Sequence, residues 1–349
     1  MTEWTREGRG QIPAAPAGPV RLQLPLGQVE ALAYWQRRAR SLLLPHAMVV
    51  EGARGIGKTT VMRWLTAALL CPSELDADGP CGVCRACTRV ASDLHPDVHL
   101  VERARDEKDA EENDKSFYVI KVDQVRQAQQ ALSLHAVEGR ARVLRIADAD
   151  SMEEEAQNAL LKTLEEPGVA TFLLLEARRP EQLLPTVRSR VQRLRVRPLD
   201  DAALARGLSE KLPNQGPRLP DALSLAHGSL GLAELACTER AVQVHDLVRA
   251  LLAGNKGLRP VAIARAVLEG KRNLRQDMAA ARMFLWLLRS ELRRRRDTLA
   301  SEGRPSYRSS PAEPCTTWLE LTLAAERDLD LLIPAEQVLT ACLVGFTVN

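Results

Sequence analysis

The sequence predicts an α/β phosphate-loop domain built on a parallel sheet, followed by a region that is helical throughout. Short apolar runs at 48–50, 143–146 and 172–175 are bounded by turn or polar residues, as parallel strands covered on both faces would be. The segment GARGIGKT at 52–59 follows the first run and precedes a helical pattern at 61–70. After Pro198, Leu and Ala recur at spacings of three and four, and no β-branched run stands out.

The remaining elements follow the same two periodicities. Residues 193–197 alternate arginine with apolar side chains, which predicts a half-buried edge strand that Pro198 ends. Ser151 and Glu154 form a capping box ahead of a predicted helix that Pro167 terminates. A mixed-sign charge run at 102–116 predicts a solvated loop. The spacings of Leu and Ala predict helices over 201–211, 220–236, 241–253, 260–269, 277–299 and 317–345.

Length and composition describe a folded chain of about two to three domains. The chain has 349 residues, of which 45% are hydrophobic and 27% charged, so wholesale disorder is excluded. Aromatic residues make up 3%, too few for a surface of stacked rings that bind single-stranded bases. The 48 basic and 45 acidic side chains give a net charge of +3, so any contact with nucleic acid is expected to be local.

Membrane and export signals are missing from the sequence pattern. No apolar run approaches the roughly 18–20 residues that span a bilayer. Residues 1–20 are rich in Ala, Pro and Gly instead of carrying an apolar signal core, and we expect them to form a flexible tail. We therefore expect a cytoplasmic protein.

The 52–59 segment fits the phosphate-binding loop G-x-x-x-x-G-K-[ST]. Glycines let backbone N–H groups surround phosphate oxygens, the lysine reaches the β and γ phosphates, and the hydroxyl binds Mg²⁺. The alternative, a glycine turn before an ordinary helix, has little weight between a strand and a helix. The candidate nucleotide-binding residues are Gly52, Gly55, Gly57, Lys58 and Thr59, with ATP and Mg²⁺ as candidate ligands.

An ATPase also needs a carboxylate at the end of a neighbouring strand to hold Mg²⁺. The run at 143–146 is followed by Ala147 where that acid is expected, and Asp148 occupies the next position. Asp148 is therefore the candidate carboxylate for binding Mg²⁺ beside the nucleotide. We predict that the isolated chain hydrolyses ATP negligibly even where it binds it.

Four of the seven cysteines form the spacing C-x9-C-x2-C-x2-C. Four thiolates close a tetrahedral site and leave no open position, so the spacing favours a structural zinc ion, with a redox-active pair as the alternative. The candidate ligands are Cys71, Cys81, Cys84 and Cys87. The other three cysteines, Cys237, Cys315 and Cys342, are expected to be buried small apolar residues.

Two charged motifs have simple alternatives to a catalytic role. Glu165 and Glu166 are neighbours in sequence and point to different sides of a helix, so we expect a solvated face and no carboxylate pair. Arg190 precedes the edge strand. It is either a surface cation or an arginine finger that reaches another subunit's nucleotide.

The motifs together resemble one family. The segments AQNALLKTLEEP at 156–167 and LPTVRSR at 184–190 resemble the bacterial DNA polymerase III clamp-loader subunits of the AAA+ superfamily. LGQ at 26–28, PHA at 45–47, the phosphate loop, the cysteine spacing and IKVDQVR at 120–126 stand in the family's order. The resemblance covers about 26–200 strongly and the helical half weakly.

Departures from the family's motor pattern favour its non-motor delta-prime branch over the gamma/tau motor. Ala147 replaces the motor's magnesium acid, Ala177 stands where the motor has a polar sensor residue, and Gly231 stands where it has an arginine. The turn at 149–152 also resembles the delta-prime version. Val191 replaces a cysteine after Arg190, but the arginine itself is present.

The resemblance implies a RecA-like AAA+ domain with a zinc module at 71–87, then an all-α lid and an all-α C-terminal collar. The implied ranges are 21–199, 200–240 and 241–349, after the tail at 1–20. It also implies a subunit of the polymerase holoenzyme that braces a ring with gamma/tau and delta. ATP-driven loading of the sliding clamp on primed DNA is the implied process, with Arg190 acting in trans.

The sequence is also compatible with two other functions. One is an active ATPase motor of gamma/tau type, which depends on whether Asp148 can replace the missing acid. The other is a zinc-dependent nucleic-acid-binding module that acts outside any ring.

Overall fold

The structure is a computed structural model that describes residues 22–23, 25–73, 79–103, 119–133, 135–138, 140–213, 218–253, 259–269, 274–301, 313–331 and 333–347. The expected tail and most of the charged run at 102–116 lie outside these residues. Contacts divide the chain into two compact units, Met1–Ala53 with Gly57–Arg197, and Arg54–Ile56 with Pro198–Asn349. This division lies close to the expected end of the first domain at 199. A separate lid and collar stay a prediction.

The first unit is built on a five-stranded parallel sheet in the order β2-β3-β4-β1-β5. The predicted strands are confirmed, and the strand at 98–101 was missed because its four residues are mostly only half-buried. The phosphate loop follows β1, which pairs with β4 on one side and with β5 on the other. The strands are β1 (Ala47–Glu51), β2 (Val98–Val101), β3 (Arg142–Ile146), β4 (Thr171–Ala177) and β5 (Gln192–Arg195).

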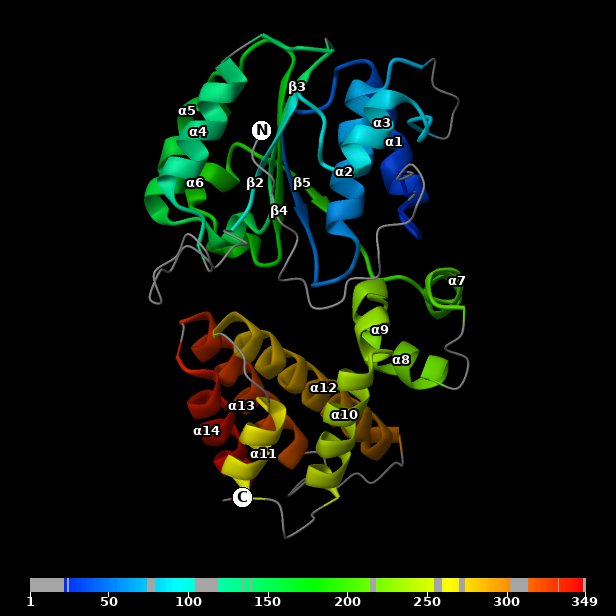
Figure 1. The fold of residues 1–349 in the computed structure, drawn as a ribbon, viewed down its shortest axis with the longest axis vertical. Helices are drawn as coiled ribbons and strands as arrows, with labels where there is room; N and C mark the ends of the chain where they lie inside the picture. Colours follow the sequence, from blue (N-terminus) through cyan, green and yellow to red (C-terminus); the bar gives the residue numbers. More distant parts are fainter. Residues whose placement is uncertain are drawn as a thin grey trace, which may run out of the picture. The chain divides into compact units, whose positions relative to one another are not determined.

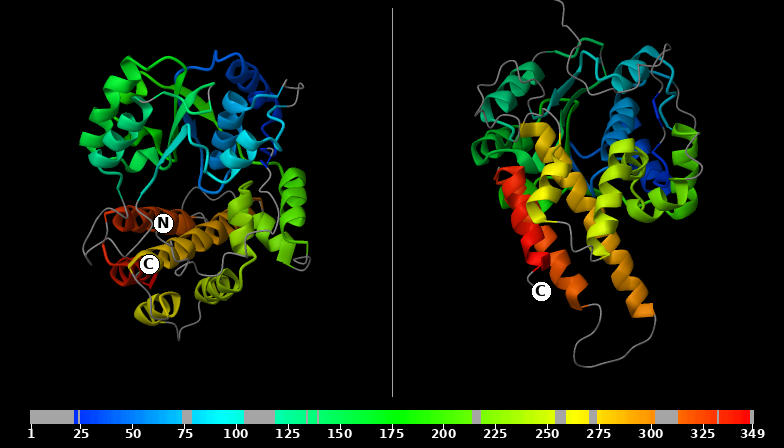
Figure 2. Two further views of the ribbon diagram at one scale, coloured as in Figure 1. Left: turned by 45° about the horizontal axis from the view of Figure 1, so that its top comes forward. Right: turned by 60° about the horizontal axis from the view of Figure 1, so that its bottom comes forward.

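Helices cover both faces of this sheet, which explains the uninterrupted apolar runs of its strands. Figure 1 and both views of Figure 2 show α1 (Val29–Arg40), α2 (Lys58–Leu70) and α3 (Arg85–Ala91) on one face. The other face carries α4 (Val122–Ser133), α5 (Glu154–Glu165) and α6 (Pro185–Arg188). Leu173, Leu175 and Ala177 of β4 belong to the core on the α4–α6 face, so Glu176 points to the face of α2.

The predicted capping box before α5 is wrong. Ser151 ends a short 3₁₀ helix, η3 (Ala149–Ser151), and its hydroxyl donates to the carbonyl oxygen of Asp148 at 2.7 Å. The backbone around Met152 pairs with Ile120, which holds residues 151–153 away from the helix start. α5 therefore begins at Glu154, without a side-chain cap.

The second unit is helical, as predicted. α12 packs against α10, α13 and α14, and α8 packs against α7 and α9. Asp200, Ser229 and Thr238 cap α7, α9 and α10 by accepting backbone N–H groups. The helices are α7 (Asp201–Lys211), α8 (Leu219–Ala226), α9 (Leu230–Ala236), α10 (Glu239–Leu252), α11 (Pro260–Val267), α12 (Leu274–Ser301), α13 (Glu313–Asp330) and α14 (Ala335–Thr347).

Two predicted helices are each divided in two. The segment 220–236 breaks at His227 and Gly228, which both have positive φ angles of 47° and 79°. A Cβ atom at Gly228 would lie 2.6 Å from the carbonyl oxygen of Leu199, so the turn requires glycine. The segment 317–345 breaks ahead of Pro334, which has no N–H group to continue a helix.

One buried acid of the second unit lies beside a histidine and an arginine. Glu291 of α12 is 3% exposed. The imidazole of His245 lies 3.6 Å from its carboxylate, and Arg294 donates to it at 2.6 Å. These two groups lower the pKa of Glu291 to about 2, against the opposing effect of burial. The folded state therefore holds this carboxylate in its ionised form.

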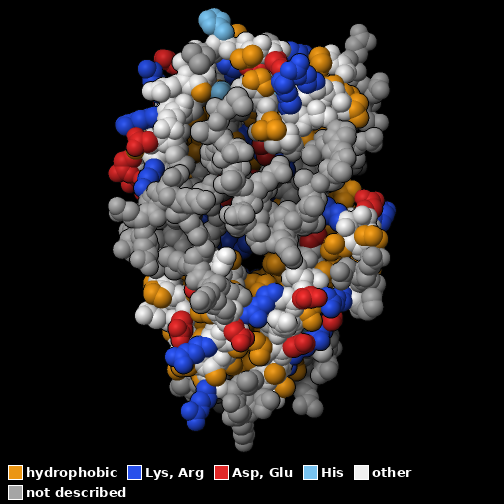
Figure 3. All heavy atoms as spheres, viewed as in Figure 1, with side chains coloured by type: hydrophobic (Ala, Val, Ile, Leu, Met, Phe, Trp, Pro, Cys, Tyr) orange, Lys and Arg blue, Asp and Glu red, His pale blue; other side chains and the backbone are white. Residues whose placement is uncertain are grey.

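The described surface mixes charges of both signs. Figure 3 shows Lys and Arg side chains interspersed with Asp and Glu on the face it presents. This mixture agrees with the small net charge of +3. Within the described ranges, no helix has the combination of length and apolar character that crossing a bilayer requires.

Candidate functional site

The phosphate loop connects β1 to α2. The N–H group of Gly52 donates to the carbonyl oxygen of Ala177 at 3.2 Å, which fixes the start of the loop to the end of β4. Gly55 and Gly57 have positive φ angles of 71° and 102°. The carbonyl oxygen of Gly55 accepts from Gly231 at 2.9 Å inside the second unit, to which residues 54–56 belong by contact. The strand, loop and helix predicted for 48–70 are confirmed.

Lys58 and Thr59, the first residues of α2, both contact an acid that sequence reasoning missed. Lys58 is buried, donates to the carbonyl oxygen of Ala53 at 2.9 Å, and lies 3.5 Å from the carboxylate of Glu176. The hydroxyl of Thr59 donates to the same carboxylate at 2.9 Å. The only sequence signal is an acid at the end of an apolar run. It was missed because the predicted strand stops at Leu175.

Asp148 lies at a different place. It adopts a left-handed conformation with φ 49°, keeps 46% of its side chain exposed, and forms an ion pair with Arg103. Its neighbour Asp150 accepts the N–H groups of Arg178 and Arg179, at 3.3 and 2.9 Å. β3 is separated from β1 by β4. Among the contacts of the described residues, none joins Asp148 to Lys58 or Thr59.

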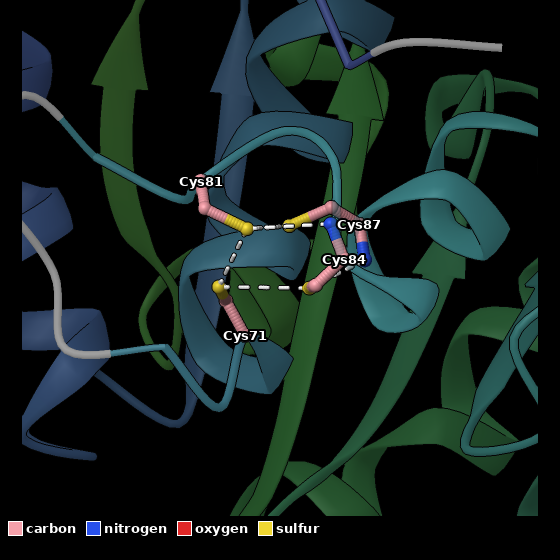
Figure 4. Close-up of side chains that lie close together, drawn as sticks. All are labelled: Cys71, Cys81, Cys84 and Cys87. Carbon is pink, nitrogen blue, oxygen red and sulfur yellow. Dashed lines mark hydrogen bonds between the residues drawn. The ribbon is translucent and has the colours of Figure 1, made fainter. Parts of the chain in front are cut away.

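The four predicted cysteines converge at the other end of α2. Figure 4 shows their thiol groups pointing toward a common centre. Cys71 follows the last residue of α2, and Cys84 caps α3 by accepting the N–H group of Cys87 at 3.5 Å. The Sγ atom of Cys71 lies 3.7 Å from that of Cys81 and 3.8 Å from that of Cys84. All four Sγ atoms lie within 4.8 Å of one another.

This spacing fits a tetrahedral metal site. With metal–sulfur bonds of about 2.3 Å, the edges of a regular tetrahedron of sulfur atoms are about 3.8 Å long. A disulfide needs sulfur atoms about 2.05 Å apart, so none of these pairs is bonded. The four thiols could therefore hold one metal ion and leave no position for a substrate.

One of these thiols, that of Cys81, has a lowered pKa. Burial opposes ionisation of Cys81, but hydrogen bonds from Ser73 and from the N–H groups of Val83 and Cys84 outweigh it and lower its pKa to about 6. Burial raises the pKa of Cys87. The other three cysteines, Cys237, Cys315 and Cys342, are buried as expected.

A buried ion pair connects the cysteine-containing segment to the sheet. Arg145 of β3 is 1% exposed and donates to Asp93, just after α3, at 2.5 Å. Arg63 of α2 donates to the same carboxylate at 3.2 Å. These two arginines lower the pKa of Asp93 against the effect of burial. Neither partner was singled out from the sequence.

Arg190 lies in the turn between α6 and β5. Its guanidinium forms an ion pair with Glu165 at 2.6 Å and donates to the carbonyl oxygen of Thr186 at 3.0 Å. Met48 pairs with Gln192, and β5 runs parallel to β1. Arg190 therefore precedes the amino end of β1, whereas the phosphate loop follows its carboxyl end, roughly 20 Å away at about 3.3 Å per residue.

Comparisons with known proteins agree with the sequence motifs. A family model described as DNA polymerase III, delta subunit, matches residues 27–200. The DNA polymerase III subunit delta' of Pseudomonas aeruginosa is 34% identical over 236 residues, 66% of this chain and 68% of that protein. The subunit delta' of Escherichia coli is 34% identical over 188 residues, 54% of this chain and 53% of that protein. A solved gamma subunit-related protein from Thermotoga maritima is 18% identical, with a TM-score of 0.44 over 92% of this chain and 99% of its own.

Proposed function

The chain belongs to the DNA polymerase III delta' family, and on that premise we propose that it is a non-motor subunit of the bacterial clamp loader. In this role it joins motor subunits of gamma/tau type and a delta subunit in a ring. The ring opens the sliding clamp and places it on primed DNA. Because chromosomal DNA is the substrate of that process, we place the protein in the cytoplasm.

Ala147 is the observation that carries the non-motor assignment. It stands at the carboxyl end of β3, where a phosphate-loop ATPase has an acid, and Asp148 is engaged by Arg103 instead. Lys58 and Thr59 retain the groups that bind phosphate and Mg²⁺. The loop therefore binds nucleotide, with turnover too slow to drive the ring.

The ion held by the four cysteines is zinc in this proposal. Zinc accepts four thiolates in a tetrahedron, and the sulfur spacing fits its bond length. Its role is structural, because it joins the end of α2 to α3. Purified protein should contain one equivalent of zinc.

Arg190 is the residue that we propose to act on a neighbour's ATP. It precedes the amino ends of β1 and β5, whereas its own phosphate loop follows the carboxyl end of β1, so it has no access to its own nucleotide. In a ring, an exposed arginine at this position can neutralise charge that develops on the γ-phosphate of an adjacent subunit. The ion pair with Glu165 is the arrangement of the separate chain.

Reconstitution tests the proposed role. The chain is mixed with gamma/tau and delta subunits, and complex formation is followed by size-exclusion chromatography. Clamp loading on primed DNA is measured with the chain present and absent. We expect a stable complex and loading that depends on the chain. A chain that stays monomeric and binds DNA tightly by itself would contradict the proposal.

A further inference from the structure

Glu176 is an acid at the phosphate loop that the function proposed above does not use. It lies on β4 in register with Val50, two residues before the loop begins at Gly52. Its side chain is 12% exposed. A carboxylate with so little exposure to water needs partners, and here they are Lys58 and Thr59.

We propose that Glu176 is the acid that assists Mg²⁺ binding at the nucleotide site. It takes the role of the carboxylate that is expected after β3, where the chain has Ala147. This inference rests on the proposed binding of nucleotide by the loop. In a phosphate loop the threonine hydroxyl is the group presented to Mg²⁺, and Thr59 donates that hydroxyl to Glu176. Mg²⁺ prefers carboxylate oxygens together with substrate phosphates.

The distances from Glu176 to Thr59 and to Lys58 distinguish a role in Mg²⁺ binding from a simpler role. The simpler role for Glu176 is that of a counter-charge to Lys58 that keeps phosphates out of the loop. However, the short contact of Lys58 is with the carbonyl oxygen of Ala53, at 2.9 Å, and its distance to Glu176 is 3.5 Å. The short contact of the acid is with Thr59, at 2.9 Å. The carboxylate is therefore held most closely by the hydroxyl of Thr59, the group that a phosphate loop presents to Mg²⁺, and its ion pair with Lys58 is the longer contact.

The sheet explains why the acid can stand on β4. β4 is the direct neighbour of β1, and β3 is one strand further away. Side chains alternate along β4, so that Ala177 faces the α4–α6 core while Glu176 faces α2. A carboxylate on this face reaches the first turn of α2 without crossing another strand. The acid therefore stands near the end of β4, one strand closer to the phosphate loop than the end of β3, where a phosphate-loop ATPase has it.

Binding of ADP to the full chain tests this assignment. Isothermal titration calorimetry is run in buffer freed of divalent cations by a resin, and again with Mg²⁺ added. A soluble chelator is avoided because it would strip metal from the cysteine cluster. Glu176→Gln keeps the size of the side chain and an oxygen that can accept from Thr59, but removes its charge. Asp148→Asn is the matched control, since it removes the acid predicted from sequence.

We expect Mg²⁺ to tighten ADP binding by wild-type protein. Glu176→Gln should weaken the Mg²⁺-dependent affinity by about 10- to 100-fold, as loss of a group that orients a metal ligand does. Its affinity without Mg²⁺ should be unchanged or higher, and Asp148→Asn should behave as wild type. A Glu176→Gln variant that keeps the full Mg²⁺ effect would overturn the inference, and so would wild-type protein that binds no ADP. Assembly with gamma/tau and delta tests the clamp-loader role separately, because it needs no nucleotide on this chain.

Discussion

The two ends of α2 carry two sites of different completeness. At its last turn, four thiols from Cys71 and a following segment converge to a spacing that one metal ion would fill. At its first turn, Lys58 and Thr59 are present but the acid expected after β3 is replaced by Ala147. The cysteine site contains every group that its chemistry needs. In our proposal the phosphate site keeps Lys58 and Thr59 for nucleotide binding but lacks a group needed for rapid turnover. The proposed roles of the two ends of α2 therefore differ: one end holds a structural metal ion, and the other binds nucleotide without driving the ring.

Loss of one thiol should have the largest effect. Cys84→Ser leaves three thiolates, and structural zinc contributes an apparent binding free energy of about 10–16 kcal/mol in small domains. We expect less than half an equivalent of zinc and a large drop in melting temperature. Elemental analysis and a thermal scan measure both. Cys237→Ser, a buried cysteine of the second unit, is the control that should keep its zinc. Unchanged metal content in Cys84→Ser would show that the four thiols are not the ligands.

Loss of the buried ion pair between Asp93 and Arg145 should have the second largest effect on stability. Asp93→Ala leaves Arg145, which is 1% exposed, without its carboxylate. Removing one partner of a buried pair costs about 3–5 kcal/mol. The exposed pair of Arg249 and Asp221, at 3.1 Å, is the reference, and Asp221→Ala should cost about 1 kcal/mol or less. Urea unfolding followed by circular dichroism compares the two. Equal costs would mean that the cysteine segment does not depend on this pair.

A buried acid of the second unit, Glu291, should make the stability of the protein depend on pH. The folded-state pKa of Glu291 is about 2, below the ordinary value of 4.5, so its contribution is present above pH 4.5 and is lost as the pH falls toward 2. The shift corresponds to about 3 kcal/mol at most. Urea midpoints of wild type and Glu291→Gln should therefore differ at pH 7 and converge near pH 2. Glu336→Gln, in an exposed pair with Arg265, should show no such convergence. A constant gap between wild type and Glu291→Gln would contradict the assignment.

The smallest expected effect is on ATP turnover by the isolated chain. Wild-type hydrolysis should already be negligible, because Ala147 offers no carboxylate after β3 and Asp148 is paired with Arg103, which leaves no acid there to orient the attacking water. Lys58→Ala should then leave the measured rate unchanged. A phosphate-release assay over hours is sensitive enough. Steady hydrolysis that disappears in Lys58→Ala would move the chain to the motor class and would remove the contrast between the two ends of α2.

Local patterns explain what could be predicted from sequence. The phosphate loop and the cysteine spacing each lie within a short segment, so residue type and spacing were sufficient. The contact between Thr59 and Glu176 joins residues 117 positions apart, and that between Asp93 and Arg145 joins residues 52 apart. Such pairs depend on strand order and register, which composition and periodicity do not determine. The same reason explains the wrong capping box at Ser151, where pairing with Ile120 overrides a local signal.

The central claim is that this chain contributes an arginine to a neighbour's site while its own site does not drive the ring. The most direct measurement is ATP turnover and clamp loading by a reconstituted ring carrying Arg190→Ala. Arg188→Ala is the matched control, since it removes an exposed arginine two residues earlier, at the end of α6. The ring should assemble normally, and turnover at the one site that Arg190 serves should fall within the ~10³–10⁵-fold range of arginine fingers. The total rate should fall less, because the other sites keep their arginines, and Arg188→Ala should match wild type. If the Arg190→Ala ring assembles and loads clamps at the wild-type rate, Arg190 is only the surface partner of Glu165, a contact worth about 0–1 kcal/mol.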